Sequence, residues 1–131
     1  MDAAPSSGAV AGVPKLILKL EGAALLIGAA FFYARFEGSW LWFAVLFLAP
    51  DLSFIAYPVS TRAGAIAYNA VHSTLGPLAL IALAAWLGWD LGERLALIWL
   101  AHVGADRALG YGLKYATAFN DTHLGRIGKS G

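Results

Sequence analysis

The stretch LALIALAAWLGW, residues 78–89, decides the fold class because it is apolar on every side. A helix on the surface of a soluble bundle keeps a polar face, and this stretch has none. It ends a longer run, GAIAYNAVHSTLGPLALIALAAWLGW at residues 64–89, which exceeds the roughly 20 residues that a helix needs to cross a bilayer. The run therefore predicts a membrane-spanning helix.

Three further stretches have the length and apolar character of membrane spans: LILKLEGAALLIGAAFFYA (16–34), SWLWFAVLFLAPDLSFIAY (39–57) and ERLALIWLAHVGADRALGYGLKYA (93–116). The chain of 131 residues is 60% hydrophobic and only 13% charged, whereas soluble domains carry about a quarter charged residues. Backbone polar groups in lipid must be satisfied within the chain, which favours helices. We predict an all-α fold, a bundle of four transmembrane helices.

The composition excludes several partners and chemistries. The net charge is +1 and no basic stripe is present, so nucleic acid is not expected as a partner. The absence of cysteine excludes disulfides and thiolate metal sites. We divide the chain into a disordered lead-in (1–14), a transmembrane domain (15–118) and a cytoplasmic tail (119–131), and we expect no cleaved signal because Glu21 interrupts the first apolar run.

The basic residues predict the orientation of the spans. With four spans, both termini share one side with the turn between spans two and three. That side carries most of the lysines and arginines, namely Lys15, Lys19, Arg62, Lys114, Arg126 and Lys129. Positive residues in short flanks stay in the cytoplasm, so both termini are expected there.

Four ionisable residues fall at similar depth in the predicted bundle: Asp51, His72 and Asp106 in the cytoplasmic half, and His102 close to mid-membrane. His102 and Asp106 are four residues apart and share one helix face. That spacing allows an imidazole and a carboxylate to bind one divalent ion, or to hydrogen-bond to each other. Intramembrane ionisable groups mark functional sites by default. We therefore take these four as the candidate metal ligands and catalytic residues, with Zn²⁺, Mn²⁺ or Fe²⁺ as the ion.

Other polar residues are candidates for supporting roles. Arg107 and Lys114 form a second stripe that could hold an anionic substrate group, although Arg107 could instead pair with Glu21. Asn69 shares a face with His72 and is a candidate for substrate binding or for an interhelical hydrogen bond. Possible additional site residues are Glu21, Asp121 and His123. Close helix packing is expected at Gly22, Gly28, Gly104 and Ala108.

The chain resembles a family of small bacterial four-span membrane proteins known as domain of unknown function 4260. The resemblance covers about residues 16–127, and the motifs that carry it are LEGAALL, LFLAPDLSFIAY, YNAVHSTLGPLAL, WLAHVGADRALGYGLKY and FNDTHLGRIG. The resemblance implies a multi-pass protein of the bacterial inner membrane. It brings no established activity.

A second resemblance is to the membrane-bound metal-dependent hydrolases, which carry a PD-x-D-H turn, an H-R-G-x-T-H-S segment and an H-x-x-x-D helix. Asp51 matches the first aspartate, His72 with Ser73 matches the later His-Ser, and the pair His102 and Asp106 matches the last motif. The chain departs from the pattern because Ser53 and Phe54 replace the second Asp and the His. Tyr68 replaces the first His of the second segment. Because these replacements remove ligands of a site with two or three metal ions, the remaining residues are compatible with a site for one ion.

The leading hypothesis is therefore a metal-dependent hydrolase with a cytoplasm-facing intramembrane site, acting on a lipid-like or phosphate-bearing substrate. A transporter or proton conductor is the first alternative, because chains of Asp, Glu and His across helices also form proton relays. Four spans are few for a pathway, so this alternative requires a homo-oligomer. The second alternative is a structural or assembly protein in which the polar groups join helices. Membrane lipids are expected partners in every case.

Overall fold

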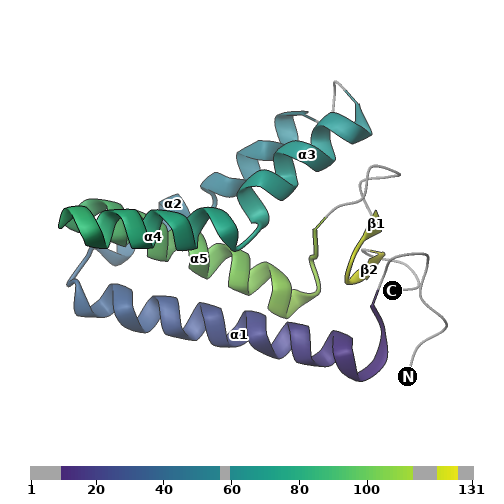
Figure 1. Ribbon diagram of the computed structural model, residues 1–131, viewed down its shortest axis with the longest axis horizontal. Helices are drawn as coiled ribbons and strands as arrows, with labels where there is room; N and C mark the ends of the chain where they lie inside the picture. The colour runs from purple at the N-terminus through teal and green to yellow at the C-terminus, as the bar shows by residue number, and fades with distance from the viewer. Residues whose placement is uncertain (1–9, 57–59, 114–120, 127–131) are drawn as a thin grey trace.

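The structure is a computed structural model that describes residues 10–56, 60–113 and 121–126. It is helical, as expected. The elements are α1 (Gly12–Arg35), α2 (Trp40–Phe47), the 3-10 helix η1 (Ala49–Ala56), α3 (Thr61–His72), α4 (Leu75–Leu87), α5 (Asp90–Leu109), and two short strands, β1 (Asp121–Thr122) and β2 (Gly125–Arg126). Figure 1 shows how they are arranged.

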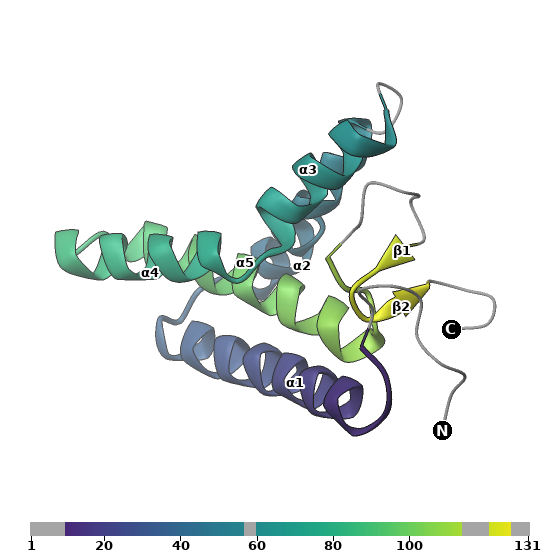
Figure 2. The same cartoon turned by 45° about the vertical axis from the view of Figure 1, so that its right-hand side comes forward.

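Helix α5 is the centre of the fold. It packs against α1, α4 and α2, whereas α3 packs mainly on η1. Figures 1 and 2 show α1 and α5 running side by side in opposite directions, while α3 leans away from the long axis of the molecule. The core between these helices is formed by apolar residues of α1 and α5: Ala29, Tyr33, Leu97, Ile98, Leu100 and Ala101. Because α5 also carries His102 and Asp106, the best-packed helix is the one that holds two candidate ligands.

Two glycines allow α1 and α5 to touch. A Cβ atom added at Gly22 would lie 2.5 Å from Cβ of Arg107 and 2.8 Å from the carbonyl oxygen of Gly104. A Cβ atom added at Gly104 would lie 2.6 Å from the carbonyl oxygen of Gly22. The prediction of close packing is confirmed at these two positions. It is wrong for Gly28, where an added Cβ would meet nothing within 4 Å.

The third predicted span is not one continuous α-helix. Helix α3 ends at His72, Ser73 is extended (φ −81°, ψ 157°), and α4 begins at Leu75. Pro77 lies in the first turn of α4, where its missing N–H leaves no intrahelical bond unmade. The sequence HSTLGP therefore ends one helix and begins another, and it places His72 at a helix end.

The second and fourth predicted spans also differ from expectation. Helix α2 ends at Phe47 and the chain continues as a 3-10 helix, because Pro50 has no N–H to continue the α-helical ladder. The N–H of Asp51 instead donates to the carbonyl of Leu48 at 3.1 Å. Helix α5 ends at Leu109 rather than at residue 116, since Gly110 adopts a left-handed conformation (φ 93°).

Two segments of the described chain are long and apolar enough to cross a membrane: Gly12–Arg35, and Thr61–Leu87, which joins α3 and α4. Only 17% of the most apolar window of each segment is buried within the protein. Large apolar side chains face outward, among them Trp86 at 85% exposure and Leu75 at 77%. A soluble monomer rarely exposes such a surface, so these segments indicate membrane association.

The C-terminal end of the described chain contacts its N-terminal end. Strands β1 and β2 pair antiparallel, and Leu124 is 1% exposed beside them. The carbonyl of His123 accepts a 2.8 Å hydrogen bond from the N–H of Val10, just before α1. The N–H of His123 donates to the carbonyl of Leu113, just after α5. This hairpin therefore joins the start of α1 to the end of α5.

Candidate metal centre

The four predicted ligands meet at one point although three separate elements supply them. Asp51 comes from η1, His72 is the last residue of α3, and α5 supplies the other two, His102 and Asp106. Each residue offers one nitrogen or oxygen atom, and these atoms all lie within 4.8 Å of one another. The sequence prediction that these four side chains gather is confirmed by this geometry.

The distances between donor atoms are those of a small coordination shell. Nε2 of His102 lies 3.1 Å from Oδ2 of Asp106 and 3.3 Å from Oδ1 of Asp51. Nε2 of His72 lies 3.4 Å and 3.5 Å from the same two oxygens, and 3.0 Å from Nε2 of His102. A tetrahedral ion with ligands at about 2.0–2.1 Å would hold its donor atoms roughly 3.3–3.4 Å apart. The residues therefore fit a divalent ion bound by two imidazoles and two carboxylates.

His72 is fixed in the tautomer that a metal ligand needs. Its Nδ1 lies 3.0 Å from the carbonyl oxygen of Tyr68, one helical turn earlier. A carbonyl can only accept, so Nδ1 carries the proton and Nε2 presents its lone pair to the cluster. The imidazole also stacks on the ring of Tyr68, with centroids 3.7 Å apart and planes 4° from parallel. Tyr68 therefore orients His72 in two ways.

His102 is held by ring contacts. Its imidazole meets the edge of Phe47 at a centroid distance of 5.1 Å and that of His72 at 5.0 Å. Its Nδ1 atom is buried and has no hydrogen-bond partner among the described residues. Both imidazoles are buried, each at 2% exposure.

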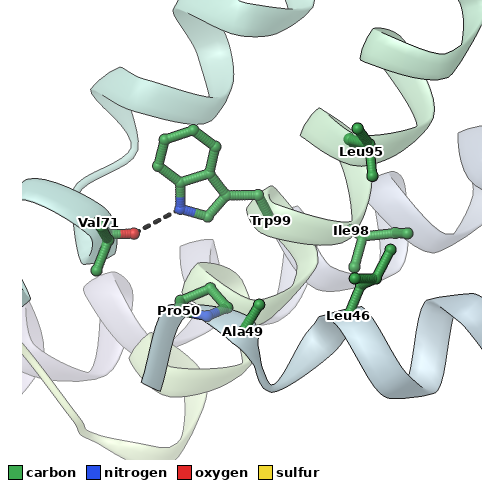
Figure 3. Close-up of a pocket in the computed structure, with 7 residues that line it drawn as sticks. All are labelled: Leu46, Ala49, Pro50, Val71, Leu95, Ile98 and Trp99. Atoms are coloured by element: carbon green, nitrogen blue, oxygen red, sulfur yellow. Dashed lines mark hydrogen bonds between the residues drawn. The ribbon is translucent and has the colours of Figure 1, made fainter. Parts of the chain in front are cut away.

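Helix α5 also caps the end of α3. The last carbonyls of a helix lack partners within it, and such groups must be satisfied where water is absent. The indole N–H of Trp99 donates to the carbonyl of Val71 (Figure 3), and a guanidinium N–H of Arg107 donates to the carbonyl of His72 at 2.9 Å. These two donors stabilise the helix end that positions His72.

The cluster opens on the side of Asp51. The side chain of Asp51 is 41% exposed and that of Asp106 is 16% exposed, whereas the two histidines are buried. The cluster is therefore accessible from outside at Asp51, whereas both imidazoles are covered.

The four-residue cluster includes none of the other predicted site residues that the structure describes. Arg107 does not pair with Glu21, because its guanidinium bonds to the carbonyl of His72 and Glu21 is exposed. Asn69 lies one turn before His72 on α3 and is half-buried. Lys114 lies outside the described residues, and so does the side chain of Asp121.

His123 is not a member of the cluster, which among the described residues comprises two histidines and two aspartates. Its Nδ1 accepts a 2.8 Å hydrogen bond from the N–H of Leu113, just beyond α5. Its ring lies so close to Gly112 that an added Cβ there would meet Nδ1 at 2.6 Å. His123 therefore fastens the hairpin to the end of α5.

Acidification should loosen this hairpin. Burial and then the positive charge of Arg107 lower the pKa of His123. A histidine whose pKa is lowered on folding adds stability that is complete above its ordinary pKa of about 6.5 and is lost as the pH falls below it. Protonation would also remove the acceptor used by the N–H of Leu113. We expect protection from hydrogen exchange at Leu113 and Val10, corrected for intrinsic rates, to fall between pH 7.5 and pH 5.

A variant supplies the control for this expectation. His123→Gln should show weaker protection at neutral pH and no further loss on acidification. Equal pH dependence in the wild type and the variant would show that His123 does not control the hairpin.

Sequence reasoning missed the roles of Tyr68 and Trp99. The available signal was spacing, because Tyr68 precedes His72 by four residues and Trp99 precedes His102 by three. Residues at these spacings share a helix face, so both aromatics had to lie beside the ligands.

Comparison with known protein families places the chain in a family of unknown function. The family described as "Domain of unknown function (DUF4260)" matches residues 15–127, a range that includes all four residues of the cluster. No curated protein and no solved structure matches the chain.

Proposed function

The chain belongs to the DUF4260 family, and we propose that it is a membrane-embedded hydrolase that uses a divalent metal bound by Asp51, His72, His102 and Asp106. The proposed substrate is lipid-like or carries a phosphate. The observation that carries the proposal is the convergence of these four donors. Each histidine Nε2 lies 3.0–3.5 Å from the other histidine Nε2 and from one oxygen of each aspartate.

The donor set favours a transition metal. Two imidazole nitrogens with two carboxylate oxygens suit Zn²⁺, Mn²⁺ or Fe²⁺. Without an ion, two carboxylates would share a partly buried site with two imidazoles, and a proton on a carboxylate or on an imidazole would be needed to offset the repulsion. A bound divalent cation offsets the same charge with no change in protonation. Metal binding is therefore the simplest electrostatic solution for this cluster.

The proposed chemistry divides between the ion and the protein. An ion at this site would polarise a phosphoryl or acyl oxygen and lower the pKa of a water molecule. The carbonyl of Tyr68 would keep His72 in its ligand tautomer, and the exposed side of Asp51 would admit the substrate. Arg107, which lies beside Asp106 in sequence, would contribute positive charge near a phosphate.

The proposal also assigns a location. We propose a multi-pass protein of the bacterial inner membrane in which α1, α2 with η1, α3 with α4, and α5 form four crossings and both termini are cytoplasmic. The apolar segments Gly12–Arg35 and Thr61–Leu87 and the distribution of lysine and arginine support this topology. Membrane lipids would then surround the protein and supply its substrate.

Metal content tests the proposal directly. Detergent-purified protein, analysed by mass spectrometry after loading with each ion and desalting, should retain close to one divalent ion per chain. A His72→Ala variant of unchanged size-exclusion profile should retain none, because one of the two imidazole ligands is missing. The loaded protein should hydrolyse a phosphomonoester, phosphodiester or lipid ester from a panel, and the variant should not.

Two results would count against this function. A wild-type protein that retains no ion after reloading would remove its basis. A protein that binds metal with normal affinity but hydrolyses none of the panel would leave a metal-binding protein without the proposed hydrolysis.

A proton-conducting role is the second candidate, and one contact favours it. The two Nε2 atoms of His72 and His102 lie 3.0 Å apart, a distance at which a proton can pass between imidazoles. In this case, proteoliposomes containing the wild type should show a proton flux that His102→Gln abolishes, and metal should inhibit it. A metal-retaining protein with no flux would exclude this candidate.

A further inference from the structure

A small apolar cavity lies beside the metal cluster. It has a volume of about 280 Å³ and is lined by seven residues: Leu46, Ala49, Pro50, Val71, Leu95, Ile98 and Trp99. Figure 3 shows Leu46, Ala49 and Pro50 on one piece of chain, Leu95, Ile98 and Trp99 on another, and Val71 on a third, with its carbonyl bonded to the indole of Trp99. These pieces are α2 with η1, α3 and α5, which also supply the metal ligands.

Residues that line the cavity are neighbours in sequence of residues that form the cluster. Pro50 immediately precedes Asp51, and Val71 immediately precedes His72. On α5, one helix face carries cavity residues and then ligands at spacings of three or four: Leu95, Trp99, His102 and Asp106. Ile98 lies four residues before His102, a rise of about 6 Å along the helix. The cavity therefore lies next to the cluster, toward the N-terminal end of α5.

The lining offers no polar group to an occupant. All seven side chains are apolar except for the indole nitrogen of Trp99, and its N–H is already bonded to the carbonyl of Val71. A polar group would lose its hydrogen bonds in such a space, whereas an apolar group has none to lose and gains van der Waals contacts with the lining. The occupant should be a hydrocarbon chain.

The direction of the cavity fits a lipid. In the proposed topology α5 runs from the far side of the membrane toward the cytoplasm, so the cavity lies deeper in the bilayer than the cluster. A lipid of the cytoplasmic leaflet has its head toward the cytoplasm and its chains toward the bilayer centre. Its head would reach the cluster where Asp51 is exposed, and one chain would point along α5 toward Leu95.

We infer that this cavity binds one acyl chain of a membrane lipid whose anionic, phosphate-type head reaches the metal cluster. The inference rests on the proposed function and names its substrate class. It also predicts that the side chain at position 49 controls how well a chain is accepted, because Ala49 leaves space that a larger residue would fill.

The test uses full-length protein in nanodiscs loaded with Co²⁺, whose visible absorption reports on the ligands of the ion. Methylphosphonate and dodecylphosphonate are titrated while this spectrum is followed. Ala49→Phe fills the cavity, and Ala82→Phe is the matched control because Ala82 is exposed on α4 and lies outside the lining. Both variants are embedded in the same bilayer, so dodecylphosphonate partitions equally into the two samples.

The half-saturating concentration of dodecylphosphonate should be at least about tenfold higher for Ala49→Phe than for Ala82→Phe, because the added ring takes the space in which the chain packs and keeps the attached phosphonate from reaching the ion. Methylphosphonate should perturb both spectra at equal concentration. Leu95→Trp replaces Ala49→Phe if the latter fails to load Co²⁺.

The outcomes separate the two proposals. Equal dodecylphosphonate titrations in the two variants, with normal cobalt spectra, would overturn the acyl-chain inference and leave the metal site intact. A wild type that gives no cobalt spectrum would overturn the proposed function and this inference with it.

Discussion

Replacing His102 with alanine should weaken metal binding by well over about 100-fold while the helical circular dichroism is kept. Loss of a residue that only supports a ligand already costs about 10–100-fold in affinity, so loss of a ligand should cost more. His102 is buried at 2% exposure, and its Nε2 is within 3.3 Å of both carboxylates, so no water can easily replace it. Isothermal titration with Zn²⁺ in detergent would measure the change.

A graded series sharpens this expectation. Asp51→Asn should cost less than His102→Ala, because Asp51 is 41% exposed and water can take the place of its oxygen. Glu21→Gln is the control, since it removes an exposed carboxylate outside the cluster and should leave the affinity unchanged. An equal, small effect of all three substitutions would show that the four donors do not bind one ion.

Replacing Gly22 with valine should separate α1 from α5 and destabilise the protein by about 3 kcal/mol or more, at the upper end of the usual cost of overpacking. The added Cβ would meet Cβ of Arg107 at 2.5 Å and the backbone nitrogen of Ala108 at 2.8 Å. Backbone atoms cannot rotate away, so one helix must move. Because Arg107 also caps α3 at His72, the shift should weaken metal binding as well. Thermal unfolding and zinc titration of the same sample would test both effects.

The same helix supplies a matched control. Gly28→Ala adds a Cβ with nothing within 4 Å, and alanine is favoured over glycine in a helix by about 1 kcal/mol. It should leave stability unchanged or raise it slightly. If Gly22→Val were as stable as Gly28→Ala, the close approach of α1 and α5 would be wrong.

Much of this protein can be predicted from local sequence. Residues 78–89 are apolar on all sides, which predicts a helix in contact with lipid, and α4 covers most of that stretch. His102 and Asp106 share a helix face at a spacing of four residues, which follows from helix geometry alone. Few charged residues occur in the apolar segments, so those that remain were the natural candidates for a site. These features are local, and each can be stated from neighbouring residues.

Only the tertiary structure decided which side chains the helix breaks bring together. Asp51 and His72 reach the cluster because Pro50 turns the chain into a 3-10 helix and α3 ends at His72. That helix end is stable because Trp99 and Arg107 of α5 donate to its last carbonyls. The sequence separation of these partners is 28 and 35 residues, so no local pattern predicts the pairing. Helical class thus follows from the apolar character of each segment, whereas the site and its cavity follow from hydrogen bonds and packing between distant segments.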